Sequence, residues 1–225
     1  MNQEQYPILD YNPSPDAAVS VAAMREADRR TIEGGTPSVE LMRRAAQGVF
    51  EAYDGWNGKA VLILCGGGNN GGDGYALAEI LHDHDITVAL YPASAKLSED
   101  GAYYYQKCVN KGISALSEPD LGSYDVYVDC LLGTGFQGVP REPIAGVIRE
   151  MNRIRAQSKG KAVISVDINS GMNGDTGEGE LAVISDLTVS IGSVKQGLVK
   201  PQARSRIARL VNADIGIRIA SSCKD

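Results

Sequence analysis

Residues 65–74, which read Cys-Gly-Gly-Gly-Asn-Asn-Gly-Gly-Asp-Gly, constrain the fold of this chain more than any other segment. They follow the apolar run of residues 60–64 and precede residues 75–81, whose pattern is typical of a helix. A strand, a glycine-rich turn and a helix in this order often bind phosphate, because glycines let the backbone approach an anion and the first helical N–H groups point toward it. The segment therefore predicts a site for a phosphorylated ligand, with a purely structural turn as the alternative.

Two common glycine-rich motifs fit this segment poorly. A P-loop ends in Gly-Lys-Ser/Thr, whereas residues 72–74 are Gly-Asp-Gly. The dinucleotide fingerprint G-x-G-x-x-G is matched by Gly66, Gly68 and Gly71, but it also needs an acid at the end of the second strand. The predicted second strand, residues 86–90, runs into tyrosine and proline instead. An oxidoreductase that transfers hydride from NAD is thus left open but not favoured.

The composition is that of one globular α/β domain. The chain has 225 residues, 43% of them hydrophobic, which is enough for a single buried core over residues 1–225 and short for two. A net charge of −6 argues against nucleic-acid partners and anionic membranes, and no apolar run approaches the ~20 residues of a membrane helix. Residues 1–4 lack the features of a signal peptide, and the four cysteines show no paired spacing. We expect a cytoplasmic protein with reduced thiols.

Strand and helix patterns alternate along most of the chain. Residues 1–16 are expected to form a flexible or extended arm. Helices are predicted at residues 20–33, 38–53 (with Ser38 as N-cap), 72–82, 98–111 and 144–156, and strands at 60–65, 86–90, 126–129, 162–167 and 187–191, with one or two more within 207–217. The strands are almost wholly apolar, as parallel strands are when helices cover both faces. The pattern predicts a doubly wound, mostly parallel sheet flanked by helices.

Polar residues follow the predicted strands at their carboxyl ends. The first strand leads into the glycine-rich segment, and a middle strand ends in Asp129, before a second glycine-rich loop at 133–138. A later strand ends in Asp167, and residues 192–197 follow the strand after it. Because the carboxyl ends of parallel strands lie at one edge of a sheet, we expect these loops to meet at one ligand site.

The acids of this predicted site indicate a cation. Asp73, Asp129 and Asp167 together would repel a bare phosphate, unless a cation lies among them or some of them face neutral groups. Asn70, Asp129 and Ser170 offer an amide oxygen, a carboxylate and a hydroxyl, which suit an alkali or alkaline-earth ion. One carboxylate among neutral ligands favours a weakly charged ion. A turn or cap role for Asp129 and a turn role for Ser170 are the alternatives.

Asp167 is the best candidate for proton transfer. It ends a buried strand, and a partly desolvated carboxyl is suited to general acid–base catalysis. Lys195 would pair with Asp167 or with a phosphate, or else lie on the surface. The two histidines, His82 and His84, fall at a helix end away from the strand tips, so a Ser-His-Asp triad is not expected.

Several segments, taken in order, carry a resemblance to a known family. They are residues 24–28 and 41–42, 68–74 (Gly-Asn-Asn-Gly-Gly-Asp-Gly), 129–135 (Asp-Cys-Leu-Leu-Gly-Thr-Gly), 167–171 (Asp-Ile-Asn-Ser-Gly) with 175–177, and 192–197. Together they resemble the YjeF N-terminal domain family, the NAD(P)H-hydrate epimerases. The resemblance covers about residues 20–217 and implies a three-layer α/β/α Rossmann-like fold, often dimeric. Members interconvert the R and S forms of NADHX and NADPHX, which are hydrated, damaged nicotinamide cofactors.

The resemblance also implies residue roles. Potassium would be held by Asn70, Asp129 and Ser170, and Asp167 would contact the substrate near the reacting ring. The hydrated dinucleotide would be bound by Asn69, Asn70, Gly71, Gly72, Asp73, Gly133, Thr134, Gly135, Phe136, Gln137, Gly138 and Val139. A separate ATP- or ADP-dependent NAD(P)H-hydrate dehydratase would then repair the S form, since residue 225 ends the sequence before any such domain.

Three positions depart from the family pattern. Asn169 stands where the family usually has proline, which should loosen that turn. Arg43 and Ala46 replace a usual acid and glycine, which puts any contribution from that helix in doubt. A non-catalytic nucleotide-binding scaffold of the same fold is the alternative function. Retention of Asp73, Asp129 and Asp167 favours the enzyme.

Overall fold

The computed structural model describes residues 8–10, 17–118 and 121–219. Within them, eight strands form one sheet in the order β1-β8-β7-β6-β5-β2-β3-β4. The strands are β1 (Ile8–Asp10), β2 (Ala60–Cys65), β3 (Thr87–Pro92), β4 (Ser114–Ala115), β5 (Val126–Cys130), β6 (Ala162–Val166), β7 (Leu187–Ile191) and β8 (Leu210–Ala213). Strand β1 pairs antiparallel with β8, and every other pairing is parallel. The predicted mostly parallel sheet is confirmed.

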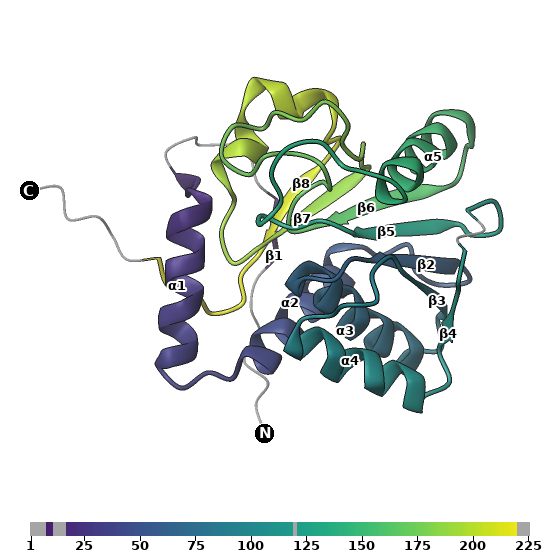
Figure 1. Ribbon diagram of the computed structural model, residues 1–225, viewed down its shortest axis with the longest axis horizontal. Coiled ribbons are helices and arrows are strands. Elements are labelled where there is room, and N and C mark those ends of the chain that lie inside the picture. Colours follow the sequence, from purple (N-terminus) through teal and green to yellow (C-terminus); the bar gives the residue numbers. More distant parts are fainter. Residues whose placement is uncertain (1–7, 11–16, 119–120, 220–225) are drawn as a thin grey trace, which may run out of the picture.

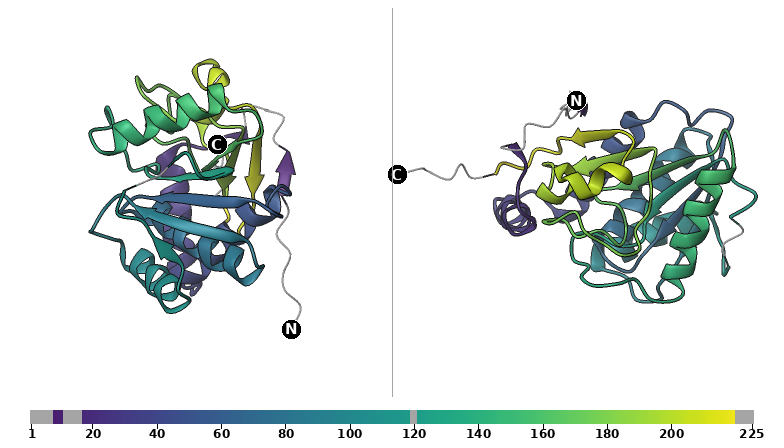
Figure 2. Two further views of the ribbon diagram at one scale, coloured as in Figure 1. Left: turned by 90° about the vertical axis from the view of Figure 1, so that its right-hand side faces the viewer. Right: turned by 90° about the horizontal axis from the view of Figure 1, so that it is seen from above.

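Helices cover both faces of this sheet, which confirms the three-layer α/β/α architecture (Figures 1 and 2). Helices α2 (Ser38–Ala52), α3 (Asn69–Asp83) and α4 (Glu99–Asn110) lie on one face. Helix α5 (Ile144–Gln157) lies on the other, the side on which the 3-10 helices η2 (Gln196–Val199) and η3 (Pro201–Ser205) are also seen.

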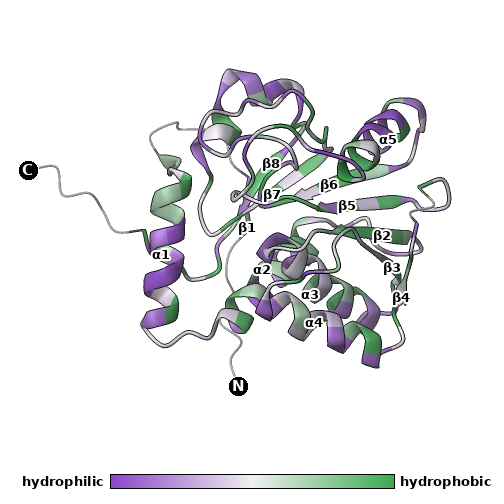
Figure 3. Cartoon of the chain, in the orientation of Figure 1, coloured by the Kyte–Doolittle hydropathy of each residue, from purple (hydrophilic) through white to green (hydrophobic). Residues whose placement is uncertain are grey.

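The side chains of the apolar strands pack into two hydrophobic cores, one on each face of the sheet. Val61 and Ile63 of β2 pack into the cluster under α2 and α3, while Leu62 and Leu64 pack into the cluster under α5. Successive side chains of a strand point to opposite faces, so a strand covered on both sides must be apolar at every position. Figure 3 shows the corresponding hydrophobic colouring along β2.

Strands β2 and β5 lie at a topological switch point. From β2 the chain continues outward through β3 and β4, whereas from β5 it continues the other way through β6, β7 and β8. Loops leaving the carboxyl ends of β2 and β5 therefore diverge to opposite sides, which leaves a crevice between them where ligands bind in open α/β sheets.

Some predicted boundaries were wrong. Helix α3 begins at Asn69, not at residue 72, so the two asparagines lie in its first turn rather than in a preceding loop. Ser38 is the first residue of α2 and not its N-cap; its hydroxyl donates to Asp100 Oδ1 at 3.0 Å instead. Residues 8–10 of the expected arm form β1, and its residues 1–7 and 11–16 lie outside the described part of the chain.

Helix α1 (Val21–Glu33) stands at one side of the molecule (Figure 1). Ser20 caps it by accepting from the Ala23 N–H at 3.1 Å, and Asp175 Oδ1 accepts from the Val21 N–H at 2.7 Å. Val19 pairs with Lys195 as an isolated β-bridge. These contacts join the start of α1 to the loops that follow β6 and β7. Neither α1 nor any other helix of the described residues has the length and apolarity needed to cross a membrane.

Candidate functional site

A cavity of about 680 Å³ opens at the carboxyl ends of β2, β5, β6 and β7. Its wall includes residues from all four predicted loops, so the expected convergence at one edge of the sheet is found. Of the residues predicted to bind the dinucleotide, those that line it are Asn69, Asn70, Asp73, Gly133, Thr134, Gly135, Phe136 and Asp167. The other five, Gly71, Gly72, Gln137, Gly138 and Val139, lie outside the lining.

The glycines of residues 65–74 allow backbones to meet closely at the switch point. A Cβ atom on Gly66 would lie 1.8 Å from the Leu131 carbonyl oxygen, and one on Gly71 would lie 2.0 Å from the Gly66 carbonyl oxygen. No side chain larger than the hydrogen of glycine therefore fits at either position. The close approach brings the amino end of α3 against the loop after β5. Gly68 is the N-cap and provides no side chain, so the first N–H groups of α3 are available to an anion.

Asp167 and Lys195 form an ion pair in the cavity wall. Asp167 directly follows β6 and has a φ of +65°, a backbone conformation that aspartate adopts more readily than most residues. Its Oδ1 accepts from Lys195 Nζ and from the Ile191 N–H at 3.1 Å. Its Oδ2 has no hydrogen-bond partner among the described residues. Lys195 is 1% exposed and also donates to the Ile191 carbonyl oxygen at 2.7 Å.

Two further carboxyl groups line the cavity near this pair. Burial raises the pKa of Asp73 well above its usual range, and the nearby charges of Asp167 and Asp28 raise it further. Burial also raises the pKa of Asp28, with Asp167 adding to the shift and Lys195 opposing it. Several carboxyls around a single buried lysine favour protonation of those that the lysine does not pair. The cavity is therefore lined by two acids, Asp28 and Asp73, whose tendency to ionise is weakened.

Asp129, Ser170, Leu132 and Asn70 form a cluster beneath the cavity. Asp129 is fully buried and accepts from the hydroxyl and N–H of Ser170, with a distance of 2.9 Å for the latter. Burial raises the pKa of Asp129, and its hydrogen bonds with Ser170 oppose that shift. Leu132 donates its N–H to Ser170 Oγ at 2.8 Å, and its carbonyl accepts from Asn70 Nδ2 at 3.2 Å. Asn70 Oδ1 is buried and has no hydrogen-bond partner within the described part of the chain.

Asn169 does not loosen the turn between Asp167 and Ser170, contrary to expectation. Its side chain is fully buried, and Nδ2 donates to the Val183 carbonyl oxygen and to Ser185 Oγ, each at 3.0 Å. Its Oδ1 accepts from the Thr188 hydroxyl at 2.7 Å. A proline lacks these groups, so here hydrogen bonds fix the turn where a ring restricts it in the family pattern.

Sequence reasoning assigned no site role to the wall formed by α1 and α2. Met24, Arg25, Asp28, Ile32, Ser38, Leu41, Met42 and Ala45 all line the cavity. Only the resemblance of residues 24–28 and 41–42 to a family pattern could have pointed to them. The departures on α2 lie elsewhere: Arg43 pairs with Glu40 outside the lining, and Ala46 is buried in the core.

Cys65 and Cys130 are core thiols. Both are fully buried and free, they are paired in register between β2 and β5, and burial raises the pKa of each well above its usual range. Neither lines the cavity. A nucleophilic role needs an accessible thiolate, which neither provides.

The fold and this site define a Rossmann-like α/β protein whose ligand cavity lies at the switch point of its sheet. Residues 38–197 match the family described as "YjeF-related protein N-terminus". The chain belongs to this family, as its motifs indicated.

Curated relatives carry two kinds of name. A protein of Limosilactobacillus fermentum called NAD(P)H-hydrate epimerase is 34% identical over 208 residues, which are 88% of this chain and 97% of that protein. A protein of Coxiella burnetii called bifunctional NAD(P)H-hydrate repair enzyme Nnr is 32% identical over 201 residues, which are 86% of this chain and 40% of that protein. The chain thus spans nearly all of the first relative and about two fifths of the second.

A solved structure shares the fold. The crystal structure of the yeast protein YNL200c aligns with a TM-score of 0.72 at 21% identity, over 87% of this chain and 86% of that one. At that identity the likeness concerns the fold alone.

Proposed function

We propose that this protein is an NAD(P)H-hydrate epimerase that interconverts the R and S forms of NADHX and NADPHX. Asp167 carries this inference, because Lys195 and the Ile191 N–H fix one of its carboxylate oxygens, while the other has no partner among the residues that the structure describes. Both oxygens belong to a side chain that lines the cavity at the switch point. Family membership and the epimerase name of relatives of similar length support the substrate class.

Asp167 would move the proton in this reaction. Inversion at a carbon that bears a ring nitrogen and a hydroxyl requires a group that gives a proton to the departing hydroxyl oxygen and takes one from the incoming water. Ring opening and closure would also need a group that takes and returns a proton, in this case from the hydroxyl group and to the ring nitrogen whose bond to the carbon breaks. The first turn of α3 (Asn69, Asn70, Gly71, Gly72 and Asp73) and residues 133–139 would bind the dinucleotide. Of these, Gly71, Gly72, Gln137, Gly138 and Val139 would act from outside the cavity wall.

The activity is tested by mixing the protein with NADHX from which the S form has been removed. We expect the S form to reappear faster than it does spontaneously, followed by chromatography that separates the two forms. Equal rates with and without protein would contradict the proposal. Tight binding of the dinucleotide without acceleration would instead favour a nucleotide-binding scaffold.

We propose that the cluster beneath the cavity binds potassium through Asn70, Asp129 and Ser170. The residues fit such an ion, because Asn70 Oδ1 is a buried oxygen that no other described residue contacts by a hydrogen bond, and Asp129 supplies one negative charge among neutral oxygens. A bound ion would offset the charge of Asp129 and fix the loops that follow β5 and β6. It would not itself exchange protons or electrons.

Potassium binding predicts a stability effect that needs no substrate. At ten times its dissociation constant, K⁺ should raise the free energy of unfolding by about 1.4 kcal/mol relative to a large organic cation at equal ionic strength. The measurement is urea unfolding in the two salts. Asn70→Ala should abolish the difference, whereas Asn110→Ala, an exposed amide on α4, should retain it. A K⁺ effect that survives in Asn70→Ala would exclude this site.

Four further properties stay predictions. The S form would pass to a separate ATP- or ADP-dependent dehydratase, an activity that the bifunctional names of some relatives accord with. A homodimer and a single domain over residues 1–225 are checked by molar mass in solution and by limited proteolysis. The free, buried state of the three described cysteines accords with the cytoplasm as the compartment.

A further inference from the structure

The cavity needs a cation to receive the phosphates of a dinucleotide. Its lining already carries four carboxyl groups, those of Asp28, Asp73, Asp100 and Asp167. Among the described residues, two basic side chains line it, Arg25 and Lys195. Lys195 is buried, pairs with Asp167 and donates to the Ile191 carbonyl oxygen. Arg25 is the basic side chain left for an anionic ligand.

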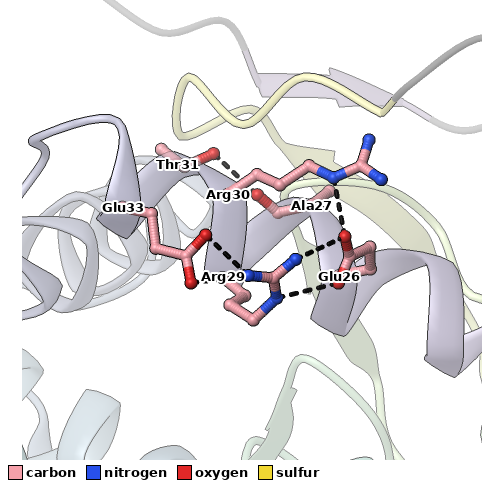
Figure 4. Close-up of polar contacts among 6 residues, drawn as sticks. All are labelled: Glu26, Ala27, Arg29, Arg30, Thr31 and Glu33. Carbon is pink, nitrogen blue, oxygen red and sulfur yellow. Dashed lines mark hydrogen bonds and ion pairs between the residues drawn. The ribbon is translucent and has the colours of Figure 1, made fainter.

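Arg25 differs from the other arginines of α1. Arg29 and Arg30 both pair with Glu26, at 2.7 Å in each case, and Arg29 also pairs with Glu33 (Figure 4). Arg25 has no ion pair or hydrogen bond with any described residue, and it is exposed to solvent. Its guanidinium is therefore free to bind a ligand.

The guanidinium of Arg25 lies against the glycine-rich loop after β5. A Cβ atom on Gly135 would lie 3.3 Å from Arg25 Nη2, so any larger residue there would press on the guanidinium. The start of α1, and with it the position of Arg25, is fixed by the hydrogen bond to Asp175 and by the β-bridge between Val19 and Lys195. The cavity also meets the amino end of α3 at Asn69. Two donors for an anion, one a side chain and one a helix end, thus face the same space.

We propose that Arg25 binds a phosphate group of the dinucleotide substrate. This inference rests on the proposed function for the nature of the ligand. A planar guanidinium makes two parallel hydrogen bonds to phosphate oxygens, which lysine does not reproduce. The phosphate is either in the diphosphate bridge, present in NADHX and NADPHX alike, or the extra 2′-phosphate of NADPHX.

The test compares Arg25→Met with Arg25→Lys and with Arg30→Met, a matched control on the outer face of α1. Calorimetric titration with NADHX and with NADPHX measures affinity without requiring turnover, and the epimerisation assay gives KM and kcat. Losing a charge-assisted hydrogen bond should weaken binding by about tenfold or more in Arg25→Met, with KM raised and kcat nearly unchanged. Arg25→Lys should recover part of the affinity, and Arg30→Met should match the wild type.

Comparing the titrations with NADHX and NADPHX shows which phosphate Arg25 binds. Equal weakening for NADHX and NADPHX places Arg25 at the diphosphate, and weakening for NADPHX alone places it at the 2′-phosphate. In either case, higher ionic strength should reduce the difference in ligand affinity between the wild type and Arg25→Met, because salt screens the attraction between the guanidinium and the phosphate. Unchanged affinity of Arg25→Met for both ligands, or no binding by the wild type, overturns the inference. An unaccelerated reaction with Arg25-dependent binding overturns the epimerase proposal and leaves the phosphate contact standing.

Discussion

Replacing Asp167 with asparagine should lower the rate of epimerisation by about 10²-fold or more, which is what a positioned general acid–base group contributes. Asparagine tolerates a positive φ, and its Oδ1 can still accept from Lys195 and from the Ile191 N–H. The substitution therefore preserves the backbone and removes the proton-exchanging group. The R-to-S assay measures the loss, and a wild-type rate would exclude Asp167 from the chemistry.

Asp85→Asn is the matched control for this experiment. Asp85 also has a positive φ, +59°, but it is exposed and precedes β3 at the opposite edge of the sheet. Its replacement should leave the rate unchanged. Because Asp167→Asn leaves the ammonium of Lys195 buried without a counter-charge, some stability will be lost as well. Adding Lys195→Met should restore stability and leave the rate low, which separates a catalytic defect from a folding defect.

Gly66→Ala should cost on the order of 3 kcal/mol in the free energy of unfolding. The new methyl group would lie 1.8 Å from the Leu131 carbonyl oxygen, and both partners are backbone, so no side chain can turn aside. The Gly66 N–H also donates to the Cys130 carbonyl oxygen at 2.9 Å, so separation of the strands would lose that bond too. Urea unfolding measures the change.

Gly68→Ala is the control for this prediction. It tests whether Gly66→Ala destabilises the protein because the new methyl group meets the Leu131 backbone, and not because any glycine in this segment is replaced. A Cβ atom on Gly68 meets nothing within 4 Å, and its φ is −91°. Replacing this N-cap glycine with alanine should lower the free energy of unfolding by less than about 1 kcal/mol. Equal destabilisation by the two substitutions would contradict the close-approach explanation.

The sequence was sufficient to predict the architecture, because the patterns that indicate strands and helices lie within short segments of the chain. Unbroken apolar runs such as Val61 to Leu64 occur where a strand is covered on both faces, and they alternate with helical periodicity along the chain. The start of α3 was missed for a local reason as well. Glycine and asparagine disfavour helix interiors, yet here tight packing of Gly66 and Gly71 sets the first turn.

The candidate site was predictable only in part. Strand ends fix where Asp129 and Asp167 lie, because parallel strands share one carboxyl edge. The places of Arg25 and Asp28 needed the folded chain, since α1 joins the cavity wall through contacts of its start with the distant loops that follow β6 and β7.

The sequence by itself determined the alternation of strands and helices, the parallel sheet covered on both faces and the acids at the strand ends, because each follows from neighbouring residues. Only the tertiary structure decided that Lys195 pairs with Asp167, that Asn169 strengthens its turn and that Arg25 stays free. These are contacts between residues far apart in sequence or the lack of such contacts. No local pattern encodes them, since they depend on which surfaces the chain buries together.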